Sequence, residues 1–129
     1  PPVVAGIDWM DPAPDEPWIL RLRDVLTGQH QVQAIHCGHL HRQITTRFAG
    51  IPLGVTPSVA PLVAMDLSPI DQETPDNREL ISTEPPTYAL HRWDGAQLVS
   101  HYERVGDWQI LARYTAGLQA MIKGMFAER

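Results

Sequence analysis

The sequence has a single cysteine, no long apolar run and fewer basic than acidic residues. One cysteine excludes an internal disulfide. The apolar runs are far shorter than the roughly 18–20 residues that span a bilayer, and no basic-then-apolar signal segment leads the chain. The net charge of -5 argues against a surface for a nucleic-acid polymer, because phosphate contacts need clustered Lys and Arg. We therefore expect a cytoplasmic protein that binds neither membranes nor nucleic-acid polymers, although a single nucleotide at a metal site is not excluded.

The 129 residues can bury one modest core, about two-thirds of their unfolded surface. A helix is predicted from Asp15 as its cap, with Pro17 in the first turn and Gly28 as its stop. Its apolar face comprises Trp18, Ile19, Leu22, Val25 and Leu26. A buried strand over residues 32–37 follows. This order predicts the αβ half of a layered α/β unit.

Two hairpins are predicted after that strand. Residues 44–48 and 51–55 flank the turn Ala49-Gly50, and residues 87–93 and 97–104 flank Asp94-Gly95. The Asp-Gly pair favours a tight type I′ turn. Several strands after one helix indicate a mixed sheet in an α/β (α+β) fold. Between the hairpins, residues 69–86 carry acidic side chains among prolines and are interpreted as a solvated loop.

The tail, residues 107–129, predicts an amphipathic helix of about five turns. Its apolar side chains at helical spacing are Leu111, Tyr114, Leu118, Met121, Ile122 and Met125. This stripe can pack on the domain's own sheet or on a second copy of the chain, since methionines suit an adaptable interface. Both alternatives remain open, so a homo-oligomer is one expectation.

The most informative motif is Gly38-His39-Leu40-His41-Arg42, directly after the predicted strand. In an extended segment, side chains at i and i+2 point the same way, roughly 6.5–7 Å apart. That spacing suits two metal ions about 3.5–4 Å apart, each bound by one imidazole. We expect Gly38 to provide the sharp bend that leaves the strand. The motif therefore predicts that His39 and His41 are metal ligands in a two-metal site.

The motif Gly38-His39-Leu40-His41 resembles the Gly-His-x-His motif of calcineurin-like metallophosphoesterases. Its flanks extend the resemblance over about residues 1 to 105. Pro1-Pro2, followed by residues 6–11 (GIDWMD), looks like the segment after the His-His-Pro-Pro motif of the bacterial cyclic-nucleotide and glycerophosphodiester phosphodiesterases. Residues 84–93 (EPPTYALHRW) are similar to the strand that enters their last hairpin.

The resemblance implies the later half of a two-sheet αββα sandwich over residues 1–105, with residues 106–129 as a C-terminal helix. It also implies a complete protein that hydrolyses a phosphate ester, either a cyclic nucleotide or a glycerophosphodiester, with two Fe, Mn or Zn ions. The family's Asp-x-His, Gly-Asp-x-x-Asp and Gly-Asn-His motifs are absent from this sequence. We therefore expect a carboxy-terminal part of an enzyme, which needs its amino-terminal half as partner and by itself binds metal weakly and is inactive.

Other polar side chains leave alternatives open. Arg42 can bind a substrate phosphate or a carboxylate of a neighbouring loop. His36 is interpreted as a packed strand histidine, and His91 and His101 as a pair facing each other across the last hairpin. Cys37 is interpreted as a small buried residue, and no side chain of this chain is expected to be a catalytic acid, base or nucleophile. The alternative function is a non-catalytic folded module that self-associates through the tail helix.

Overall fold

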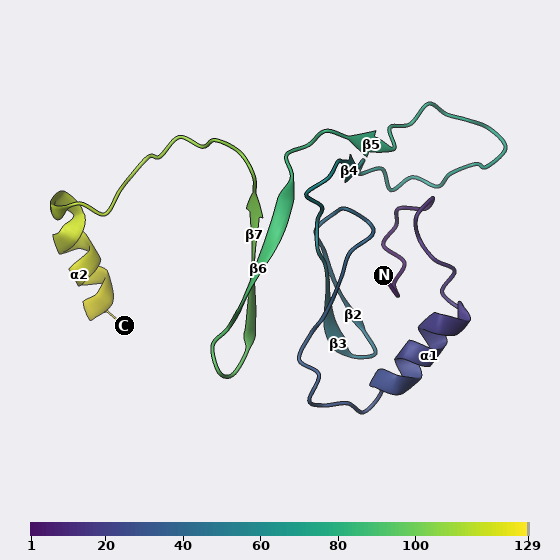
Figure 1. The fold of residues 1–129 in the computed structure, drawn as a ribbon, viewed down its shortest axis with the longest axis horizontal. Helices are drawn as coiled ribbons and strands as arrows, with labels where there is room; N and C mark the ends of the chain where they lie inside the picture. Colours follow the sequence, from purple (N-terminus) through teal and green to yellow (C-terminus); the bar gives the residue numbers. More distant parts are fainter. Residues whose placement is uncertain (129) are drawn as a thin grey trace.

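The computed structural model describes residues 1–128 and has the mixed helix and strand content that the sequence predicts (Figure 1). Its elements, in chain order, are α1 (Pro17–Leu26), β1 (Ile35–Cys37), β2 (Ile44–Phe48), β3 (Ile51–Val55), β4 (Leu62–Val63), β5 (Ile81–Ser82), β6 (Thr87–Trp93), β7 (Leu98–Arg104), the 3-10 helix η1 (Ala116–Leu118) and α2 (Gln119–Ala127). None of the described helices is long and apolar enough to cross a membrane.

A three-stranded mixed sheet forms the centre of the fold, in the order β1-β3-β2. Strand β1 is parallel to β3, and β2 is antiparallel to it. Ala49 and Gly50 join β2 to β3 with φ of 51° and 81°, the backbone region that a type I′ turn requires at both positions. The first predicted hairpin is therefore confirmed.

Helix α1 covers one face of this sheet and supplies part of the apolar core. The fully or largely buried members of that core are Ile19, Leu40, Phe48, Leu53 and Val55. Trp18 and Val25 are 42% and 66% exposed, so the buried face of α1 is narrower than predicted. The residue at the N-cap is Glu16, without a side-chain hydrogen bond, so the prediction that Asp15 caps the helix is wrong.

The β6-β7 hairpin contacts the other face of the central sheet. The rings of His36 in β1 and His91 in β6 have centroids 4.1 Å apart. A Cβ at Gly54 in β3 would lie 3.2 Å from the hydroxyl oxygen of Tyr102 in β7. The order helix, sheet, hairpin gives three successive layers, as expected for part of a layered sandwich.

The register of this hairpin differs from the sequence prediction. His91 lies opposite Ser100, and His101 lies opposite Leu90, so the predicted His91–His101 pair is wrong. The side chain of Asp94 accepts hydrogen bonds from the backbone N–H groups of Ala96 and Gln97, both at 2.9 Å. The backbone N–H of Asp94 donates to the carbonyl oxygen of Gln97 at 3.2 Å, so the two-residue loop is Gly95-Ala96, with a positive φ at Gly95 alone, and the predicted type I′ turn at Asp94-Gly95 is wrong.

The tail forms a shorter helix than predicted. Residues 107–115 are irregular, α2 begins at Gln119, and Arg129 lies outside the described residues. An isolated helix is marginal in water unless its apolar face packs, and the tail lies away from α1 and the central sheet (Figure 1). The prediction of five continuous helical turns is therefore wrong.

Candidate metal centre

The segment between β1 and β2 is bent and positions the two histidines of the motif. His39 and His41 both have positive φ, 83° and 53°, which is uncommon for residues other than glycine. Leu40 between them is 0% exposed and packs in the core. The extended backbone that the spacing argument assumed is therefore wrong, and a buried leucine anchors the segment instead.

The bend does not depend on Gly38. Gly38 does not have a positive φ, and a Cβ built there would meet no atom within 4 Å. The prediction that Gly38 provides the sharp bend is therefore wrong. The unusual backbone conformation lies at the two histidines, where strained residues are typical of functional sites.

His41 has a defined hydrogen-bond partner. Its Nδ1 lies 2.8 Å from the backbone carbonyl oxygen of Pro61, just before β4. Because a carbonyl oxygen only accepts, Nδ1 must carry the hydrogen in the neutral ring. The lone pair then lies on Nε2, the arrangement that orients a metal-binding imidazole. His39 is more exposed than His41.

Arg42 binds two groups of the β4-β5 region. Its Nε donates to the carbonyl oxygen of Val63, and its Nη1 and Nη2 donate to the two carboxylate oxygens of Glu84, with Nη1 3.1 Å from Oε2. The bond from Arg42 and a second from the Ser82 hydroxyl hold the pKa of Glu84 below its usual range. Of the two alternatives for Arg42, the carboxylate is the partner seen here. Since three of its five N–H donors are engaged, two remain.

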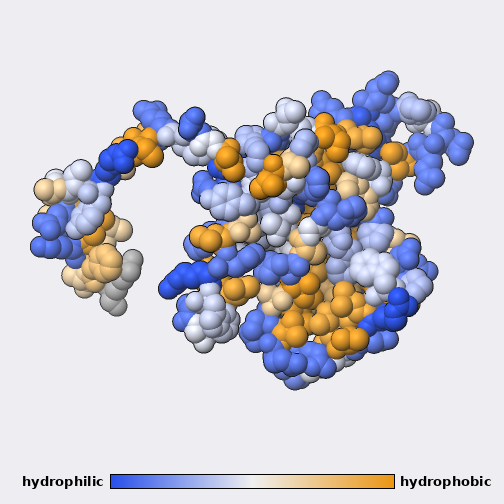
Figure 2. Space-filling model, in the orientation of Figure 1, coloured by the Kyte–Doolittle hydropathy of each residue, from blue (hydrophilic) through white to orange (hydrophobic). Residues whose placement is uncertain are grey.

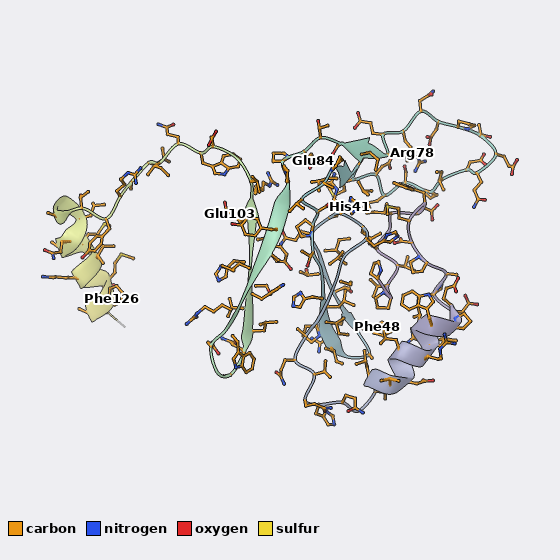
Figure 3. All side chains as sticks on the ribbon, viewed as in Figure 1. His41, Phe48, Arg78, Glu84, Glu103 and Phe126 are labelled. Carbon is orange, nitrogen blue, oxygen red and sulfur yellow. The ribbon has the colours of Figure 1, made fainter. Side chains whose placement is uncertain are left out.

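These side chains line a pocket of about 240 Å³, and His41 and Glu84 lie beside each other where β4 and β5 approach the loop after β1 (Figure 3). Thr87 and Arg104 also line this pocket, together with His41, Arg42 and Glu84. His39 is not among the lining residues. The motif thus places one histidine and the arginine at the pocket and the other histidine outside it.

The donor set fits part of a metal centre. The Pro61 carbonyl leaves Nε2 of His41 able to bind a metal ion, which is the chemistry that iron, manganese and zinc accept. Among residues 1–128, however, no group of three or more His, Cys, Asp or Glu side chains could hold a metal ion. The described residues therefore provide the His41 imidazole at the pocket but no complete set of metal ligands.

The remaining titratable groups near the motif are explained by packing. Burial, and then the charge of His91, lower the pKa of His36. Burial raises the pKa of the Cys37 thiol, whose Sγ lies 3.8 Å from the Gly54 carbonyl oxygen. A raised pKa disfavours the thiolate. His36 occupies the exposed position of β1 and its ring contacts that of His91, so the prediction of a packed histidine bonded to a backbone group is wrong.

Sequence reasoning missed Glu84, which was included in the solvated loop. No local pattern marks it, because Glu84 and Arg42 are 42 positions apart in the sequence. The other carboxylates of that segment are exposed, as predicted for a solvated loop, and Arg78 binds Asp76 and the carbonyl oxygen of Ser68. Residues 81–82 form β5, however, so the prediction of a loop over the whole of residues 69–86 is wrong.

No family model matches the chain. The chain is 34% identical, over 110 residues, to the probable glycerophosphodiester phosphodiesterase GpdQ of Arcobacter nitrofigilis. The match covers 84% of this chain and 38% of the relative, so the chain spans well under half the length of the protein it matches.

This similarity confirms the resemblance that the motifs indicate. The similarity is consistent with a carboxy-terminal part of a calcineurin-like metallophosphoesterase.

Proposed function

We propose that this chain supplies the Gly-His-x-His part of a dinuclear metal centre that hydrolyses a phosphate ester. The substrate class is a phosphodiester, either a cyclic nucleotide or a glycerophosphodiester. The observation that carries the proposal is the hydrogen bond from Nδ1 of His41 to the Pro61 carbonyl oxygen, which leaves the lone pair of the ring on Nε2, where a metal ion can bind. The similarity to a probable glycerophosphodiester phosphodiesterase supports the same reaction.

The roles of the side chains follow from their chemistry. His39 and His41 would each hold one metal ion through an imidazole nitrogen. Metal ions in such a centre lower the pKa of bound water and neutralise charge on the phosphoryl oxygens. Arg42 would donate its two remaining N–H groups to a phosphate oxygen while its other donors stay on Val63 and Glu84.

The other ligands would come from polypeptide outside the described residues. Two imidazoles are a poor cage for two such cations, whereas carboxylates and further histidines usually complete it. The isolated chain would accordingly bind metal weakly and be inactive. Its partner in the active protein would be the amino-terminal half of the same enzyme.

The experiment compares the isolated chain with a protein extended upstream along the same reading frame. Metal content and hydrolysis of bis(4-nitrophenyl) phosphate are measured for both, and for His39→Ala and His41→Ala in the extended protein. Each variant is expected to lose one metal ion preferentially and most of its turnover. His30→Ala, in the exposed loop after α1, is the control, and it should keep the metal content and the turnover of the unsubstituted protein.

Two results would contradict the proposal. The first is turnover by the isolated chain at the rate of the extended protein. The second is unchanged metal content and turnover in both histidine variants.

Self-association through the tail is the second candidate, favoured by a specific observation. The exposed apolar side chains of the tail include Trp108, Ile110, Leu111, Tyr114, Met121 and Met125, and apolar and polar side chains alternate along its surface (Figure 2). Large apolar side chains that stay exposed in this way can be buried against a second copy of the chain. Light scattering of the chain and of Leu111→Glu would test it. A dimer that the substitution dissociates supports self-association, and a concentration-independent monomer contradicts it.

A further inference from the structure

His41 and Arg42 are adjacent in sequence and bind two nearby backbone carbonyls. His41 contacts the oxygen of Pro61, and Arg42 contacts that of Val63, so the motif is joined to the β4 segment at two points. The two bonds fix the position of the Pro61 carbonyl relative to the imidazole. The orientation of His41 therefore depends on where β4 lies.

Strand β4 has little regular structure of its own to hold it. It contains two residues and pairs with the two residues of β5, Leu62 with Ser82 and Val63 with Ile81. Even a full two-stranded hairpin is marginally stable in water. The position of β4 therefore depends on the burial of Leu62 and Val63, which are 5% and 1% exposed, and on polar contacts from outside this pair.

Glu84 provides such a contact. Its carboxylate accepts the two Nη donors of Arg42 and, at 2.9 Å, the hydroxyl of Ser82 in β5. The bonds form a closed circuit: Arg42 to Glu84, Glu84 to Ser82, Ser82 across the ladder to β4, and β4 back to Arg42. The forked geometry of a guanidinium on a carboxylate fixes direction as well as distance.

We propose that Glu84 is a positioning residue for His41. It holds Arg42 and β5 so that the Pro61 carbonyl stays on Nδ1 and the lone pair of His41 stays on Nε2. This inference rests on the proposed function, because it concerns how one proposed metal ligand is oriented. Glu84 does not itself touch the imidazole, and it acts through Arg42 and the β4 segment.

The test measures the tautomer of His41 in the full chain. Long-range ¹H–¹⁵N correlation spectra of histidine-labelled protein, recorded at alkaline pH, separate rings protonated at Nδ1 from rings protonated at Nε2. The chain has six histidines, and His41→Gln identifies the signals of residue 41. The wild-type chain is expected to show His41 mainly as the Nδ1-protonated form.

Two variants break the circuit from opposite ends. Glu84→Gln removes the charge and one of the two acceptor oxygens, and Arg42→Lys keeps the charge but loses the fork. In each, the ratio of Nδ1- to Nε2-protonated His41 should fall about fivefold, the ratio equivalent to one ordinary hydrogen bond. Because the two variants act independently, either one tests the inference if the other does not fold.

Asp76→Asn is the matched control. Asp76 also binds an arginine, Arg78, and the exposed fractions of the two pairs are alike: 48% and 9% for Asp76 and Arg78, against 43% and 17% for Glu84 and Arg42. No bond of that pair reaches residues 61–63 in the described structure. The His41 ratio should therefore stay at the wild-type value.

An unchanged His41 ratio in a folded Glu84→Gln or Arg42→Lys chain would overturn the inference. An equal fall in Asp76→Asn would do the same, because it would show a general effect of loosening the loop. The readout needs neither metal nor turnover. Its failure therefore leaves the proposed hydrolysis standing, and failure of metal binding leaves the tautomer result valid.

Discussion

Truncation of Leu40 is the most direct test of how the core supports the metal motif. Leu40 is 0% exposed and lies between the two histidines, with its side chain among Ile19, Phe48 and Val55. Leu40→Ala removes those contacts and leaves a cavity that the neighbours fill only partly. The expected loss is about 3 kcal/mol in the free energy of unfolding, the middle of the range for buried leucines.

The assay is urea unfolding followed by circular dichroism, together with a thermal scan. For a domain of this size, about 3 kcal/mol corresponds to a fall in Tm of roughly 10 °C. Leu90→Ala is the matched control, because it makes the same substitution at a leucine whose side chain is 61% exposed. Its effect should stay within about 0.5 kcal/mol.

A loss below about 1 kcal/mol for Leu40→Ala would refute the reasoning, since it would mean that this segment is not anchored in the core. Equal losses for Leu40→Ala and Leu90→Ala would refute it as well, because burial would then not determine the cost. A second readout in the same samples, the His41 tautomer, should also change in Leu40→Ala, since the motif loses its anchor.

Two further predictions concern glycine and histidine. Gly95→Ala should cost about 1 kcal/mol in urea unfolding because Gly95 has φ of 102°, whereas Gly38→Ala should be near neutral, and equal effects would contradict this. The folded chain holds the pKa of His36 below its ordinary value of 6.5, so the unfolded chain binds more protons and stability should fall as pH drops below about 6.5. His36→Gln should flatten that slope between pH 7.5 and 5, with His30→Gln as control; an unchanged slope in His36→Gln would contradict the assignment.

The parts of the fold that follow from local chemistry could be predicted from the sequence. The turn Ala49-Gly50, the strands on both sides of it and the helix with Pro17 in its first turn all depend on neighbouring residues. The hairpin register could not be predicted in the same way. It depends on which residues form the loop, and the bonds of Asp94 to Ala96 and Gln97 place that loop at Gly95-Ala96.

In the candidate site too, the features that depend on neighbouring residues could be predicted, and those that depend on distant residues could not. The motif residues His39, His41 and Arg42 were visible because they are contiguous. Their environment was not, because Pro61 is 20 positions and Glu84 42 positions from their partners. The tail failed for a related reason: its apolar spacing predicts a helix only where another surface covers it, and residues 107–115 have no such cover in the described structure.

The strand order β1-β3-β2 has a consequence for assembly. Within residues 1–128, β1 and β2 each pair on one side only, so both outer borders of the central sheet present backbone N–H and C=O groups without strand partners. Such borders accept additional strands readily, and natural proteins usually shield or extend them. A polypeptide that adds a strand to the β1 border would extend the sheet beside Cys37, the last residue of β1 before the two histidines of the motif.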